Sequence, residues 1–173
     1  MKTPIYPCLW YDGNAMEAAE LYAQAFKDVT VSACTALVVT FTIKGKQFMG
    51  LNGGPNSKPN PSISFINVCA STEEIEQAWN ILQEDGKILM PLQKYPWSEN
   101  CGWVQDKFGV SWQLMLADAN NKSEVFPSLM FVGEQNGKAR TAIDFYTSLF
   151  HNSSKELVAE YEPGEGDTPG NIK

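Results

Sequence analysis

The pattern of hydrophobic and polar positions predicts two consecutive units with the same order of elements: a strand, a helix and three strands. Apolar residues at helical spacing mark the helices, and β-branched or alternating stretches mark the strands. In the first unit the predicted strands cover residues 4–11, one or two stretches within 29–43, and 47–52. In the second unit they cover residues 62–70, 87–93, 101–106 and 110–116, with residues 94–100 as a loop.

Each predicted helix begins at a residue that can cap its first turn. Asn14 is followed three positions later by Glu17, and Ser71 is followed at the same distance by Glu74. A small polar residue with an acidic residue three positions on can satisfy the free backbone N–H groups at a helix start. The two pairs therefore predict where the helices begin.

Alternation along the strands of the second unit gives its sheet two chemically different faces. One side, which we expect to carry the helices, holds the apolar residues Ile63, Phe65, Val110, Trp112, Leu114 and Leu116. The opposite side shows semi-polar residues, namely Ser62, Ser64, Ser111, Gln113 and Met115. Such a face on central strands predicts the wall of a cavity. The alternative is that this face simply meets water.

Gln113 is the most informative residue of that face, because a polar amide in mid-strand needs a partner or a cavity. A curved sheet would turn the semi-polar face inward. Together the patterns predict an α+β protein. In it, paired βαβββ modules form a cupped mixed sheet with helices on the outer face.

A sequence repeat marks the end of the first domain. YPCLWYDG at residues 6–13 returns as FPSLMFVG at residues 126–133, and AAELYAQAF returns as AIDFYTSLF. We therefore expect a complete domain over residues 1–120 and the start of a second, incomplete copy over residues 121–173. Half a unit cannot close its own core. The segment either belongs to a longer two-copy protein, which we favour, or docks on the first domain or a partner chain.

Composition and charge narrow the range of partners and compartments. The 173 residues carry a net charge of −7, and an acidic chain without a Lys/Arg cluster argues against nucleic acid and anionic membranes. No apolar run approaches the ~20 residues of a membrane span. MKTPIYPCLW lacks a signal-peptide pattern, and the four cysteines form no CxxC pair. We read them as reduced thiols in a cytoplasmic protein.

Four stretches of the chain resemble one known family. PCLWYDGNAMEAAELYAQAF, FMGLNGGP, SISFINV and CGWVQDKFGVSWQL are similar to the PhnB-like family, also labelled 3-demethylubiquinone-9 3-methyltransferase. That family belongs to the vicinal-oxygen-chelate superfamily, with glyoxalase I, bleomycin-resistance proteins and extradiol dioxygenases. The resemblance covers residues 4–116. It implies paired βαβββ modules around a pocket, in agreement with the hydrophobic pattern.

The resemblance also implies where relatives hold a divalent metal. Those ligand positions fall here on Pro7, Gly50, Ser62 and Gln113. Proline and glycine side chains cannot ligate, and a single amide does not hold a metal. We therefore predict neither a metal nor a cofactor. The single histidine, His151, falls in the partial copy, where we expect it to be exposed at a helix end.

The methyltransferase label implies a loop that binds a methyl donor. The glycine pair at residues 53–54 lies in a connector between strands and precedes Pro55, so we expect a turn there. Few other residues are candidates for a nucleophile or a general base. Cys101 has no histidine nearby to activate it, and Asp106 is expected to cap a turn.

These observations predict a domain that binds a small molecule without a metal. The predicted ligand-binding residues are Asn52, Ser62, Ser64, Trp103, Ser111, Gln113 and Met115. One alternative is an enzyme, either a metal-dependent lyase, isomerase or dioxygenase or a methyltransferase as the label states. Another is a dimerising module without a ligand. A homodimer is expected, because such modules commonly pair and sheet edges need cover.

Overall fold

The structure is a computed structural model, and it describes residues 5–118 and 122–173. The chain divides into two compact units, Met1–Ser128 and Leu129–Lys173. The helices α1, α2 and α3 have 11 residues each. Within the described part of the chain, no helix is long and apolar enough to cross a membrane.

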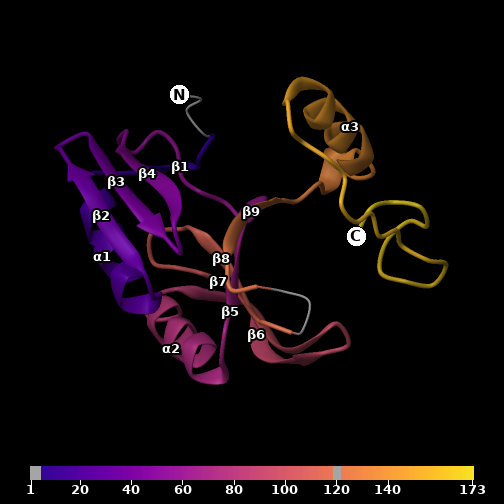
Figure 1. The fold of residues 1–173 in the computed structure, drawn as a ribbon, viewed down its shortest axis with the longest axis horizontal. Coiled ribbons are helices and arrows are strands. Elements are labelled where there is room, and N and C mark those ends of the chain that lie inside the picture. The colour runs from indigo at the N-terminus through magenta and orange to yellow at the C-terminus, as the bar shows by residue number, and fades with distance from the viewer. Residues whose placement is uncertain (1–4, 119–121) are drawn as a thin grey trace. The chain divides into compact units, whose positions relative to one another are not determined.

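The first sheet of the larger unit has four strands in the order β1-β4-β3-β2 (Figure 1). β1 runs parallel to β4, and the other neighbours are antiparallel. Helix α1 (Ala15–Ala25) follows β1 in the chain. The strands are β1 (Cys8–Tyr11), β2 (Val29–Cys34), β3 (Val38–Ile43) and β4 (Lys46–Asn52).

The second sheet has five strands in the order β6-β7-β8-β5-β9, and its first four strands repeat the topology of the first sheet. β5 runs parallel to β8, and helix α2 (Thr72–Leu82) follows β5. The predicted α+β class with two strand–helix–three-strand units is confirmed. The strands are β5 (Ile63–Cys69), β6 (Lys87–Tyr95), β7 (Ser98–Gln105), β8 (Ser111–Leu116) and β9 (Val125–Leu129).

The hairpin between β6 and β7 is tighter than the predicted loop over residues 94–100. Tyr95 pairs with Ser98, so the connection shortens to two residues, Pro96 and Trp97. The rings of Tyr95 and Trp97 stack with centroids 5.1 Å apart. Contacts of this kind stabilise a hairpin end, but alternation along a single strand does not reveal them.

Trp112 of β8 lies at the centre of an aromatic core. The side chain is fully buried, and its ring centroid lies 4.9 Å from Tyr22, 4.7 Å from Phe26 and 5.3 Å from Phe65. Full burial of one large apolar side chain stabilises a fold by roughly 1.5–3 kcal/mol. Since Tyr22 belongs to α1 and Phe65 to β5, this single ring packs the helix of one module against the sheet of the other.

Asp106 joins the turn before β8 to helix α1 through a buried network. Its Oδ1 accepts hydrogen bonds from the N–H groups of Phe108 (2.9 Å) and Val110 (3.0 Å), so it caps the turn as predicted. Its Oδ2 accepts from the Tyr22 hydroxyl at 2.9 Å and from the Trp112 indole at 3.0 Å. Burial raises the pKa of this carboxyl, and the four hydrogen bonds act in the opposite direction.

Helix α2 begins with the predicted capping pair. Ser71 Oγ accepts from the N–H of Glu74 at 3.3 Å, and Glu74 Oε2 accepts from the N–H of Ala70 at 3.2 Å. Lys44, in the turn between β3 and β4, places its Nζ 2.8 Å from Glu74 Oε1. Burial would raise the pKa of Glu74, but the hydrogen bond and charge of Lys44 and the Ala70 N–H outweigh it, so the pKa is lowered.

Helix α1 begins where predicted but without the predicted cap. Asn14 makes no side-chain hydrogen bond at the helix start. Instead, Asn52 Oδ1 of β4 accepts from the N–H of Ala15 at 2.9 Å. The prediction for Asn14 was wrong because a partner brought in by the sheet satisfies that N–H group, and a local sequence pattern cannot show it.

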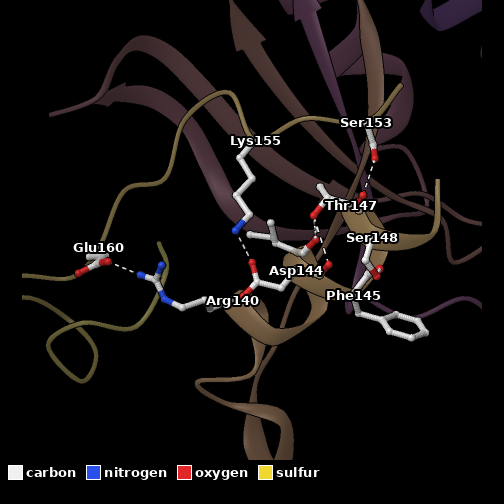
Figure 2. A network of polar contacts seen from close by, with 9 residues as sticks. Arg140, Asp144, Phe145, Thr147, Ser148, Ser153, Lys155 and Glu160 are labelled. Carbon is white, nitrogen blue, oxygen red and sulfur yellow. Dashed lines mark hydrogen bonds and ion pairs between the residues drawn. The ribbon is translucent and has the colours of Figure 1, made fainter. Parts of the chain in front are cut away.

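The smaller unit contains a 3-10 turn (Gly133–Gln135), helix α3 (Ala139–Leu149) and an irregular C-terminal segment. Figure 2 shows the ion pairs Arg140–Glu160 and Asp144–Lys155, which tie this segment to α3. The ring of Phe145 points away from them (Figure 2). His151 is exposed, as predicted. Four large apolar side chains at this helix end also stay exposed: Phe145, Tyr146, Leu149 and Phe150.

Candidate functional site

Part of the predicted ligand-binding set gathers on one face of the second sheet, here called the site face. The site face consists of Ser64 from β5, Trp103 from β7, and Ser111, Gln113 and Met115 from β8. The strand register pairs Ser64 with Ser111 and Trp103 with Gln113. Residues that alternate with them, such as Trp112, are buried in the core. The site face is therefore the side of the sheet away from the aromatic core.

Two hydrogen bonds connect the polar groups of the site face. Gln113 Nε2 donates to Ser64 Oγ at 2.8 Å, and Trp103 Nε1 donates to Ser111 Oγ at 3.3 Å. Ser64 and Ser111 are buried beneath these longer side chains, which are themselves half-buried. The amide of Gln113 thus has a partner across the strands. The face offers hydroxyl, amide and indole groups. The two hydrogen bonds fix which of these groups donate and which accept.

The other two predicted residues, Asn52 and Ser62, lie apart from the site face. Asn52 belongs to the first sheet, where its Oδ1 caps α1 and its Nδ2 donates to the carbonyl of Ala36 at 2.9 Å. Ser62 is exposed just before β5, and its N–H donates to Asn60 Oδ1 at 2.9 Å. The Asn52 amide therefore has hydrogen-bond partners within the fold for both its oxygen and its nitrogen. A ligand-binding role for either residue stays a prediction.

Two further neighbours on the site face were not among the predicted residues. Ile66 pairs with Gln113 in the strand register and is half-buried. Cys101 pairs with Met115 and is buried, and burial raises the pKa of its thiol. A protonated thiol is a weak nucleophile. Period-two alternation was the signal for Ile66, because it lies two positions after Ser64 on one strand.

The residues at the metal positions implied by the family resemblance do not fit a metal ion. Pro7 has no side-chain donor atom, Ser62 is exposed, and Gln113 offers a single amide oxygen, which does not hold a metal by itself. A Cβ atom added to Gly50 would lie 3.0 Å from Ala15 Cβ, so this position points at α1. Among the described residues, no group of three or more His, Cys, Asp or Glu side chains could hold a metal. We therefore assign no step to a metal.

The glycine pair after β4 serves the packing of Trp10. A Cβ atom added to Gly53 would lie 2.3 Å from the Trp10 ring, so only glycine fits there. Trp10 Nε1 donates to the carbonyl of Gly54 at 2.7 Å. A loop that binds a methyl donor would normally lead from a strand into a helix. Here the pair follows β4 and leads through a connector to β5, as the sequence predicted.

Comparison with known proteins agrees with this architecture. A family model described as 3-demethylubiquinone-9 3-methyltransferase matches residues 3–115. A PhnB protein from Bacillus cereus is 35% identical, with a TM-score of 0.63 over 66% of this chain and 100% of that chain. None of the curated proteins matches.

More distant structures share the fold alone. A glyoxalase-related enzyme from Fulvimarina pelagi is 13% identical, with a TM-score of 0.51 over 71% of this chain and 98% of its own. The fosfomycin resistance protein FosX of Listeria monocytogenes is 11% identical, with a TM-score of 0.52 over 69% of this chain and 94% of its own. The chain therefore belongs to the PhnB-like, 3-demethylubiquinone-9 3-methyltransferase family.

Proposed function

We propose that this chain binds a small organic molecule on the site face without a metal ion. The observation that carries the proposal is the joined set of Ser64, Trp103, Ser111 and Gln113 on central strands, with their side chains away from the core. Half-buried Trp103 and Met115 supply apolar surface next to these polar groups. Binding sites commonly combine a mainly apolar wall with a few fixed polar groups.

We propose that a second copy of the chain covers the site face. The unit that binds the ligand is then a homodimer. Support comes from the first sheet, where the side opposite its buried residues carries half-buried Val38, Met49 and Leu51. Apolar side chains on an open sheet face favour association. The proposal includes a cytoplasmic location, which the four free cysteines support.

Analysis of protein purified without added ligand tests the proposal directly. Native mass spectrometry should show a small organic adduct that disappears under denaturing conditions, on a species with the mass of a dimer. Elemental analysis should find no stoichiometric zinc, nickel, iron or manganese. A tightly held transition metal at one ion per chain would contradict the metal-free proposal, and a persistent monomer would contradict the dimer.

Gln113→Leu tests whether the site face holds that adduct. Removing one hydrogen bond to a half-buried group should lower the free energy of unfolding by only about 1 kcal/mol, while the adduct is lost. Gln24→Leu, on the exposed surface of α1, is the matched control and should keep the adduct. Equal retention by both variants would place binding elsewhere.

Residues 121–173 are proposed as the start of a second copy of the first domain, which covers residues 1–120. Helix α3 has the same 11-residue length as α1 and carries the repeated aromatic pair. A chain that ends at Ser128 should then show the same urea unfolding midpoint for the larger unit as the full chain. Loss of that cooperative transition would contradict the proposal.

A further inference from the structure

A cavity of about 830 Å³ lies in the larger unit, away from the site face. The first sheet contributes β1 and the start of β4, and the second contributes the start of β5 and part of β9 (Figure 1). The connector at residues 57–60 completes the wall. Ile63 and Phe65 line it, whereas Ser64 between them belongs to the site face. The cavity and the site face are therefore distinct.

The inner wall of this cavity is apolar. Leu9, Phe48, Phe65, Val110 and Val125 line it, and each is a buried member of the hydrophobic core. A volume of this size falls within the range of roughly 300–1,000 Å³ that is usual for sites of small organic ligands. The inner wall therefore suits an apolar body of that class.

The mouth of the cavity exposes further apolar side chains. Ile5, Ile63 and Phe126 line the cavity and are 79%, 52% and 39% exposed. Large side chains of this kind are usually withdrawn from water, and their clustering marks a contact surface. A ligand that enters here would keep contact with apolar surface from the mouth to the inner wall.

The charges around the cavity have one sign. Lys46 and Lys58 line it, and the described lining includes no Asp or Glu. Among the described residues, neither lysine has a carboxylate within ion-pair distance, although the chain as a whole carries a net charge of −7. Two unpaired cations beside an apolar cavity in an acidic chain favour a ligand with an anionic head.

We infer that this cavity binds an amphipathic organic anion, with its apolar body inside and its head group at Lys46 and Lys58. Burial of the apolar body supplies most of the affinity. Exposed ion pairs contribute little to affinity, so the lysines mainly select the sign of the head group. The inference is independent of the proposed function of the site face.

Calorimetric titration with two twelve-carbon amphiphiles tests this inference. Dodecanoate and dodecyltrimethylammonium share a chain length and carry heads of opposite sign. Each is added to the full chain below its micelle concentration. Dodecanoate should bind at one molecule per chain and at least about tenfold more tightly than the cation, as expected from two lysines and lost repulsion. Equal affinities, or no binding of dodecanoate, would overturn the inference.

Variants at the mouth locate the binding. Ile63→Glu puts a carboxylate at the cavity and should weaken dodecanoate binding by more than about tenfold. Ile88→Glu is the matched control, because Ile88 is 48% exposed and does not line the cavity. If Ile63→Glu fails to fold, Phe126→Glu serves the same purpose. Equal weakening by the control and the cavity variant would overturn the inference.

Lysine variants separate the head group from the apolar body. The double change Lys46→Gln and Lys58→Gln should weaken dodecanoate binding by about fivefold and leave binding of the cation no weaker. A double change of Lys87 and Lys122, which do not line the cavity, alters the net charge equally and should have no such effect. Gln113→Leu should leave dodecanoate binding intact, so failure here is distinguishable from failure of the site-face proposal.

Discussion

The strand–helix pair β1–α1 and its repeat β9–α3 have related sequences and different surroundings. Both helices have 11 residues, and both end in a stacked Tyr–Phe pair. The ring centroids of Tyr22 and Phe26 are 6.2 Å apart, and those of Tyr146 and Phe150 are 6.3 Å apart. Yet the first two side chains are 0% and 4% exposed, whereas Tyr146 and Phe150 are 44% and 46% exposed.

The difference teaches which properties are local. Helix length and ring stacking follow from side chains four positions apart on one helix, so they are the same in both copies. Burial follows from a sheet that must come from elsewhere in the chain. Tyr22 meets Phe41 and Trp112, while the rings found against Tyr146 belong to Phe145 and Phe150 of its own helix end.

Truncation of the equivalent tyrosines should give the largest contrast. Tyr22→Ala removes a fully buried ring and its two hydroxyl contacts, so it should lower the free energy of unfolding by about 4 kcal/mol. Tyr146→Ala should change it by less than about 0.5 kcal/mol, because that ring is half exposed. Urea unfolding monitored by circular dichroism measures both. Similar losses would show that α3 is buried against a surface in solution.

The buried ion pair at α2 should stabilise the fold more than the exposed ion pair at α3. Lys44→Met leaves Glu74 buried, with Lys27 Nζ still 4.0 Å away, and should cost about 2 kcal/mol near neutral pH. Lys155→Met breaks the exposed pair with Asp144 and should cost less than about 0.5 kcal/mol.

The pH dependence of the Lys44 variant is a separate check. Because the folded pKa of Glu74 is lowered from 4.5, the pair contributes stability above that pH and loses it as the pH falls through the folded pKa. The difference between wild type and Lys44→Met should therefore shrink in acid. A difference that is constant with pH would point to packing rather than charge.

Asp106→Asn tests how much the hydrogen bond from the Tyr22 hydroxyl to Asp106 adds to the packing of the Tyr22 ring. An amide places a donor group where the Tyr22 hydroxyl and Trp112 indole need acceptors, so the change should cost about 2 kcal/mol. Burial raises the folded pKa of Asp106 above 3.8, so its contribution is complete below that pH and declines as the pH rises through the folded pKa. The loss in the variant should thus be larger in acid than at neutral pH. Urea unfolding midpoints of wild type and variant, compared in acid and at neutral pH, measure this difference in stability.

Asn52→Ala should have a smaller effect than Tyr22→Ala, Lys44→Met or Asp106→Asn. It removes the side chain that satisfies the N–H of Ala15 at the start of α1, and loss of such a cap costs about 1 kcal/mol. Ser71→Ala is the comparison, because it removes a local cap from α2. Similar losses would show that a cap from another strand stabilises a helix as well as a local one. No loss for Asn52→Ala would mean that water replaces it.

The sequence predicted helices and strands well wherever the hydrophobic residues followed a clear helical or alternating period. The stretch 29–43 resolved into β2 and β3, and alternation correctly placed Trp112 and Leu114 in the core. The site face was predicted by the same alternation, although its ligand-binding role stays a prediction. Asn52 was grouped with it because it lies two positions after Gly50, a ligand position implied by the family resemblance, although both belong to the first sheet.

Taken alone, the order of residues determined the secondary structure, the two-module topology and the family, because periodicity and capping are short-range properties. Only the tertiary structure decided that Asp106 bonds to Tyr22 and that Asn52 caps α1. It also decided that a cavity opens between the edges of the two sheets. Each of these depends on segments far apart in the chain, and no local pattern records which distant groups the packing brings together.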